Sequence, residues 1–190
     1  DASQGYTGAQ LHDIAVDPAN SLRVYTIGRS GPFCSADGGG NWEGLGHRPA
    51  TGAEWNAVAM NPQNPDNVLI SGEFRGNLLL SVDGGSTWMG VFWHPIAARG
   101  GVTDRHGFKA ITYAPSDPSI VYAGMRKGRR TINNDLFVGP SFGVYKSTDG
   151  GQSWEEKNQG LEDTGKNINA FAVHPQNPDI AYVATWRDGM

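Results

Sequence analysis

Cysteine, charge and long apolar runs are all scarce in this sequence, and each shortage excludes a class of protein. The single cysteine, Cys34, rules out an internal disulfide. No apolar run approaches the roughly 18 residues that a membrane-spanning helix needs, so we expect no membrane span. Fifteen basic against 19 acidic side chains give a net charge of −4. This balance argues against a nucleic-acid partner, because nucleic-acid-binding proteins usually carry a basic surplus.

Signatures of cofactor and metal binding are missing as well. The sequence has neither a P-loop nor a Gly-x-Gly-x-x-Gly segment that opens a helix, so nucleotide binding has no support. The five histidines show no His-x-x-x-His spacing. His94, Asp104 and His106 are close enough in sequence to meet, but they make a weak candidate. We therefore expect no cofactor and no metal.

Glycine and proline are abundant, with 27 and 11 copies, together one residue in five. An average protein has about 12% of the two combined. They interrupt every stretch long enough for a helix, whereas aromatic residues make up 10% of the chain. This composition predicts an all-β protein of many short strands joined by turns.

An internal repeat gives these strands an order. Four short apolar segments each end at a proline, and a second apolar strand follows each of them. The four segments are His12–Pro18, Asn56–Pro62, Lys109–Pro115 and Asn169–Pro175. A third strand then leads into the pattern Ser-x-Asp-Gly-Gly-x-[Asn/Ser/Thr]-Trp, where a fourth strand is expected to start. Repeats of about 40–50 residues with four strands each are typical of β-propeller blades.

The second pattern resembles the Asp-box, or BNR repeat, of sialidases, sortilin-type receptors, xyloglucan-cleaving hydrolases and photosystem assembly factors. Its three copies place Ser35, Asp37 and Trp42, then Ser81, Asp83 and Trp88, then Ser147, Asp149 and Trp154. The resemblance implies a β-propeller and leaves the function open, because the same box occurs on enzymes, receptors and scaffolds. The resemblance suggests carbohydrate binding as one candidate function. It also suggests a secreted protein with an extracellular or periplasmic location.

We expect a structural role for the box residues. The Gly-Gly pair permits a tight turn, the Asp carboxylate can accept main-chain N–H groups of that turn, and the Trp can pack between blades. Calcium binding is the rival interpretation, but the loop lacks the further acidic positions of an EF-hand.

The repeats divide the chain into blades of approximately 11–53, 54–107, 108–166 and an incomplete 167–190. About three and a half blades are thus present, fewer than in most propellers. We expect further blades, either as part of a larger propeller of about six to eight blades or from other chains that close the ring. The open edge of the last blade should be covered by something outside this sequence.

The loops opposite the Asp-boxes are long and charged, which makes that face the expected working surface. An arginine precedes a glycine after strand two in every blade: Arg29, Arg75, Arg126 and Arg187. Arginines so arranged could bind an anionic ligand, or they could be inherited repeat residues that pair with nearby carboxylates. The insertion 127–142 adds Arg129 and Arg130, and Trp186 could stack on a sugar ring. A disordered surface loop is the alternative for the insertion.

Two functions remain open at this point. The first is a binding or scaffold propeller that recognises a carbohydrate or an acidic protein partner. The second is a piece of a sialidase-like or xyloglucanase-like glycoside hydrolase, for which Glu73 and Asp104 are weak candidates as catalytic carboxylates. The sequence shows no Arg-Ile-Pro element and no recognisable Tyr–Glu pair of the sialidase kind, so the catalytic residues stay unassigned and an enzyme is the less favoured hypothesis.

Overall fold

The computed structural model describes residues 10–46, 55–72, 77–93, 107–126, 129–132, 135–138, 142–161 and 166–186. These residues form strands, turns and bends, and none of them is helical. The described part of the chain accordingly contains no helix long and apolar enough to cross a membrane.

Three antiparallel four-stranded sheets follow one another along the chain. The first contains β1 (Leu11–Val16), β2 (Val24–Gly28), β3 (Gly31–Ser35) and β4 (Glu43–Gly44). The second contains β5 (Trp55–Met60), β6 (Val68–Gly72), β7 (Asn77–Ser81) and β8 (Met89–Trp93). The third contains β9 (Phe108–Tyr113), β10 (Val121–Met125), β13 (Val144–Ser147) and β14 (Glu155–Glu156). The predicted all-β fold of four-stranded blades is confirmed, although each fourth strand begins just after the Trp rather than at it.

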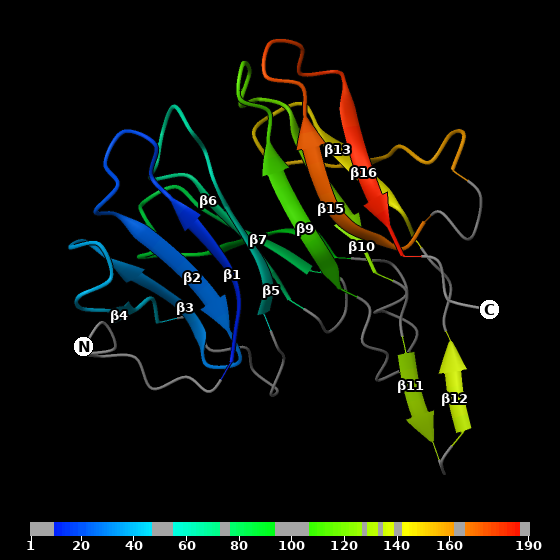
Figure 1. Cartoon of the computed structure of the whole chain (residues 1–190), viewed down its shortest axis with the longest axis horizontal. Coiled ribbons are helices and arrows are strands. Elements are labelled where there is room, and N and C mark those ends of the chain that lie inside the picture. Colours follow the sequence, from blue (N-terminus) through cyan, green and yellow to red (C-terminus); the bar gives the residue numbers. More distant parts are fainter. Residues whose placement is uncertain are drawn as a thin grey trace.

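Two hairpins complete the structure. Strands β15 (Ile168–Val173) and β16 (Ala181–Thr185) form the start of a fourth blade. Strands β11 (Arg129–Ile132) and β12 (Asp135–Val138) form a separate hairpin inserted between β10 and β13. Figure 1 shows the blades succeeding one another from β1–β4 to β15–β16, with the inserted hairpin projecting away from them. The first strands lie next to each other, because β5 contacts both β1 and β9, and β9 contacts β15.

The hydrophobic core lies between the blades, in three clusters. One cluster joins the first and second blades around Tyr25 and Val58. Another joins the second and third blades, where the rings of Phe92, Phe108 and Tyr145 meet edge to face with centroids 5.0–5.5 Å apart. The third joins blade three to the last hairpin. A blade therefore buries both faces of its sheet only where another blade packs against each face.

Polar contacts reinforce two of these junctions in the same way. The Tyr25 hydroxyl donates a hydrogen bond to the carbonyl of Gly84 in the next blade, at 3.0 Å. Arg23, which lies over the Tyr25 ring, pairs with Asp66 of that blade at 2.7 Å. Between blades three and four the corresponding contacts join Tyr122 to the Pro178 carbonyl (2.9 Å) and Lys146 to Asp179 (2.6 Å). At the middle junction the buried Leu69 replaces the tyrosine.

The Asp-box turns share one end of the blades with the turns that follow strand one. The first Gly of each box donates its N–H to a carbonyl of that neighbouring turn. These bonds join Gly38 to Leu22, Gly84 to Asp66 and Gly150 to Ser119, at 2.8–2.9 Å. The loops after strand two consequently lie at the opposite end, as antiparallel order predicts.

Candidate functional site

The face opposite the Asp-boxes is built around one repeated main-chain contact. The residue directly after strand two donates its N–H to the carbonyl of the residue just before strand one. The bonds run from Arg29 to Gln10 (3.2 Å), from Arg126 to Gly107 (3.0 Å) and from Trp186 to Asn167 (2.9 Å). Two arginines and a tryptophan thus hold equivalent positions in three blades. Trp186 is 49% exposed, so its ring is accessible to a partner.

A β-bulge lies beside each of these positions. The pairing of strands one and two shifts by one residue in all four blades, and the extra residue is always the second of strand one. The bulged residues are His12, Asn56, Lys109 and Asn169. Bulges redirect side chains and concentrate near functional sites. These four residues open the repeated segments of the sequence, but the sequence pattern alone predicts no role for them.

The strand ends change which residues are equivalent. Alignment on the following glycine predicts one arginine per blade, at Arg29, Arg75, Arg126 and Arg187. Strands β2, β6, β10 and β16 instead end so that Arg29, Glu73, Arg126 and Trp186 come directly after them. Arg75 and Arg187 stand two residues and one residue further on, outside the described residues. Of the four arginines, only Arg29 and Arg126 therefore occupy matching places.

The predicted insertion contains the hairpin β11–β12. Its register sets Arg129 opposite Val138 and Arg130 opposite Phe137. The hairpin follows Arg126 closely in the chain and extends from the same end of the third blade (Figure 1). It places the main chain of two further arginines on the side of the molecule that carries Arg29, Arg126 and Trp186.

The candidate carboxylates Glu73 and Asp104 both lie outside the described residues, as does the connection 94–106. Among the residues that the structure describes, no group of three or more His, Cys, Asp or Glu side chains is arranged to hold a metal ion.

The Asp-box carboxylates, in contrast, are fully engaged within their own turns. The Ser81 hydroxyl donates to Asp83 at 2.8 Å and accepts the N–H of Gly85 at 2.7 Å. Thr87 donates both its N–H and its hydroxyl to the two oxygens of Asp83, at 2.8 and 2.6 Å. The boxes of blades one and three repeat these contacts through Ser35, Asp37 and Asn41, and through Ser147, Asp149 and Ser153.

These donors stabilise the charged form of each carboxylate. Hydrogen bonds from the main chain and side chain of Asn41 lower the pKa of Asp37 to about 2. The hydroxyl and N–H of Thr87 lower the pKa of Asp83 to about 2. For Asp149 burial acts in the opposite direction, but the hydrogen bonds from Ser153 and Ser147 outweigh it and the pKa is lowered. Carboxylates held in this way suit a structural role and are poorly suited to proton transfer at neutral pH.

The three box tryptophans differ in their contacts. The indole N–H groups of Trp42 and Trp154 donate to the carbonyl of the second Gly in their own boxes, both at 3.0 Å. Trp88 donates instead to the Leu45 carbonyl of the preceding blade, at 3.3 Å. Trp88 and Trp154 also pack against the clusters between blades.

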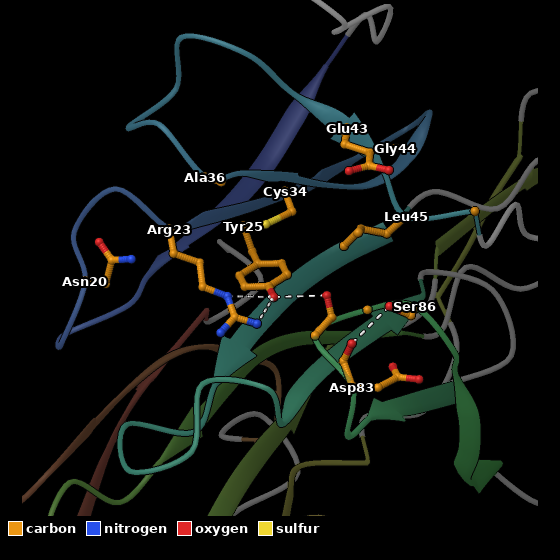
Figure 2. Close-up of a pocket in the computed structure, with 13 residues that line it drawn as sticks. Asn20, Arg23, Tyr25, Cys34, Ala36, Glu43, Gly44, Leu45, Asp83 and Ser86 are labelled. Carbon is orange, nitrogen blue, oxygen red and sulfur yellow. Dashed lines mark hydrogen bonds between the residues drawn. The ribbon is translucent and has the colours of Figure 1, made fainter.

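A cavity of about 540 Å³ opens between the first two blades, beside their Asp-boxes (Figure 2). Arg23, Tyr25, Cys34 and Glu43 line it. Burial raises the pKa of Tyr25 to about 12 and also raises the pKa of the Cys34 thiol, so both stay protonated at neutral pH. Because Arg23 and Tyr25 already hold the two blades together, we assign this cavity to the blade junction rather than to a ligand. The half-buried Cys34 lacks the environment of a reactive thiol.

Comparison with known proteins agrees with this architecture. The family model described as BNR/Asp-box repeat matches residues 145–156, the third box with its flanking strands. The chain therefore carries Asp-box repeats and forms blades of a BNR-type β-propeller. No curated protein matches this sequence.

Solved structures resemble the chain at low sequence identity. An ancestral GH74 enzyme is 19% identical with a TM-score of 0.71, over 95% of this chain and 22% of its own. The extracellular domain of a protein from B. thetaiotaomicron is 12% identical with a TM-score of 0.64, over 96% and 21% of the two chains. YCF48 bound to D1 peptide is 18% identical with a TM-score of 0.54, over 80% and 40%. The chain thus spans less than half the length of these structures, and the likeness concerns the fold alone.

Proposed function

We propose that this chain is part of a ligand-binding or scaffold β-propeller, and that the face opposite the Asp-boxes recognises a carbohydrate or an acidic protein segment. One observation carries the proposal. On that face, Arg29, Arg126 and Trp186 hold equivalent positions. Beside each of them, strand one of the same blade begins with a β-bulge.

The chemistry of these residues suits such partners. A guanidinium offers paired donors to a carboxylate or sulfate, and it can also bond to sugar hydroxyls. The exposed indole of Trp186 provides a flat apolar surface for a sugar ring or a side chain. Of the bulged residues, Lys109 is half-buried and Asn169 is exposed, so both add hydrogen-bonding groups on the first strands, which lie next to one another. Asn56 is buried, and the His12 ring already contacts the Trp55 carbonyl.

The comparisons support both classes of partner. YCF48, whose structure is described as bound to D1 peptide, shows that a propeller of this fold can hold a peptide. The ancestral GH74 enzyme keeps the hydrolase alternative open, with Glu73 and Asp104 as its candidates in this chain. An extracellular or periplasmic location would give such a protein access to polysaccharides, and one of the similar structures is itself an extracellular domain.

The test is a binding array that carries neutral xyloglucan oligosaccharides, oligosaccharides of uronic acids, and acidic peptides. We expect saturable binding by the chain to one of these classes. The double variant Arg29→Ala, Arg126→Ala should lose about tenfold or more in affinity if each guanidinium contributes a charged hydrogen bond. Lys157→Ala is the control, because it removes an exposed positive charge that follows β14, the outermost strand of the third blade, whereas Arg29 and Arg126 follow second strands. Equal losses for both variants, or no binding to any probe, would contradict the proposal.

The hydrolase alternative has its own measurement. Release of reducing ends from xyloglucan by the chain, abolished by Glu73→Gln or Asp104→Asn, would favour the enzyme. Binding without release would favour the scaffold.

A further inference from the structure

The second strand of the last blade has an open edge. In the three complete blades the second strand pairs on both sides: β2 lies between β1 and β3, β6 between β5 and β7, and β10 between β9 and β13. Strand β16 pairs with β15, and no other described strand pairs with it. A strand edge of this kind offers a row of main-chain donors and acceptors to any strand that fits.

Hydrogen bonds at the two ends of β16 show which residues form that edge. The carbonyl of Ile180 accepts from His174, and the N–H of Trp186 donates to Asn167, so both residues point toward β15. Main-chain groups alternate in direction along a strand. Ala181, Val183 and Thr185 therefore direct their N–H and carbonyl groups to the open side.

A cavity of about 360 Å³ lies beside this edge, between the third blade and the last hairpin. Tyr122, Leu161, Phe171 and Val183 are among the residues that line it. In blade two the comparable position, toward the preceding blade, is filled by Leu79 of β7, which is 4% exposed. Strand three of a blade thus normally supplies the side chain that fills this space.

Blade four also has the turn whose carbonyl accepts an N–H from the Asp-box in the other blades. Each Asp-box is held by a bond from its first Gly to the fourth residue after the proline that ends strand one, namely Leu22, Asp66 or Ser119. Asp179 is the residue at that place after Pro175. The last hairpin therefore has three features that receive an Asp-box hairpin elsewhere in the chain: an open second strand, a cavity and this turn.

We propose that β16 and the adjoining cavity bind a β-hairpin made of a third strand, an Asp-box turn and a fourth strand. In the third blade, Val121 of β10 pairs with the box residue Ser147, and Ala123 pairs with Tyr145. Ala181 and Val183 are the equivalent residues of β16, so the Ser of the bound hairpin lies opposite Ala181 and a large apolar residue lies opposite Val183. In blades two and three that residue is Leu79 or Tyr145. This assignment is independent of the ligand proposed for the opposite face.

The test uses a labelled synthetic peptide with the sequence of residues 142–157, which contains a third strand, a complete Asp-box and the start of a fourth strand. We expect one peptide to bind per chain in fluorescence anisotropy. Hydrogen exchange should slow in the segment that contains Val183 and Thr185. Slowing in β10 alone would mean that the peptide has displaced β13, its own counterpart, and would overturn the assignment.

Two variants of the chain make the test specific. Val183→Pro removes one outward N–H without breaking the pairing with β15, so it should weaken peptide binding about tenfold while the circular dichroism spectrum stays unchanged. Thr185→Pro serves the same purpose at an exposed position, should Val183→Pro disturb packing. A peptide with Tyr145→Lys should also bind about tenfold more weakly, because the cavity-filling residue is lost. Equal binding by all peptides and variants, no binding at all, or a chain that dimerises and excludes the peptide would overturn the proposal.

Discussion

The hydroxyl of Tyr122 donates a hydrogen bond to the main-chain carbonyl of Pro178, 2.9 Å away, and so links the third blade to the fourth. Tyr25 makes the same kind of link from blade one to blade two. Tyr182 stands at the same place in its strand as these two residues, yet it is 63% exposed. One repeat position therefore has two environments, depending on whether a blade follows.

Tyr122→Phe should lower the free energy of unfolding by about 1 kcal/mol, because it removes the hydroxyl from a partly buried hydrogen bond and leaves the Pro178 carbonyl without that donor. Tyr182→Phe is the control at the equivalent position and should change stability by less than about 0.5 kcal/mol, as exposed substitutions usually do. Urea unfolding followed by circular dichroism measures both. Equal effects would mean that the hydroxyl of Tyr122 is not what links the blades.

The ion pair between Arg23 and Asp66 should contribute a small, salt-sensitive amount. Its nitrogen and oxygen are 2.7 Å apart, but the Asp66 side chain is 57% exposed, so solvent screens the interaction. Asp66→Asn should destabilise the chain by about 0.5 kcal/mol at low ionic strength and less at 1 M salt. Glu155→Gln, which breaks the more exposed pair with Lys157, is the control and should have no measurable effect. A loss that does not depend on salt would assign the effect of Asp66 to packing.

The Asp-boxes should make stability depend on pH in the acid range. The pKa values of Asp37 and Asp83 are lowered from an ordinary value of 3.8 to about 2. Their carboxylates therefore stabilise the folded chain above about pH 4, and this contribution is lost as the pH falls toward 2. Asp83→Asn should reduce the urea midpoint at pH 7 and make it fall less steeply between pH 4 and pH 2. A variant with the same slope as the original chain would show that Asp83 is not a source of the acid sensitivity.

The Asp-boxes and the four-strand repeat could be predicted from the sequence because both depend on local chemistry. A Gly-Gly turn closed by Asp83 and Ser81 uses residues within a few positions of one another. The junction contacts could not be found in this way, since Arg23 and Asp66 are 43 residues apart and nothing in the local pattern relates them. The bulge at Lys109 could not be predicted either, because it exists only as a shift in the pairing of β9 with β10. Alignment of the arginines on the next glycine failed for a different reason, because the number of residues between the end of strand two and that glycine differs among the blades.

The second glycine of each Asp-box gives the sharpest test of blade packing. Gly151 has φ +97°, and a Cβ there would come within 2.7 Å of Leu69 Cδ1 of the preceding blade. Gly85 has φ +93°, and its Cβ would come within 2.6 Å of Leu45 Cδ1. Leu69 is fully buried, whereas Leu45, directly after β4, is half-buried and has more room to move. Gly151→Ala should therefore be the more damaging of the two substitutions.

Gly46 separates the strain of the main chain from this overlap, because it has φ +66° and a Cβ there would meet nothing within 4 Å. Gly46→Ala should cost about 1 kcal/mol, which is the penalty for an L-residue in the left-handed region. Gly85→Ala should cost about 2 kcal/mol and Gly151→Ala about 3 kcal/mol, because overpacking adds to that penalty. The order is measured by urea unfolding of the three variants, and Gly151→Ala combined with Leu69→Ala should be less destabilised than the two single effects added together. If all three glycine substitutions cost the same, the close approach of the box to the preceding blade contributes nothing, and main-chain conformation alone explains the glycine at this position.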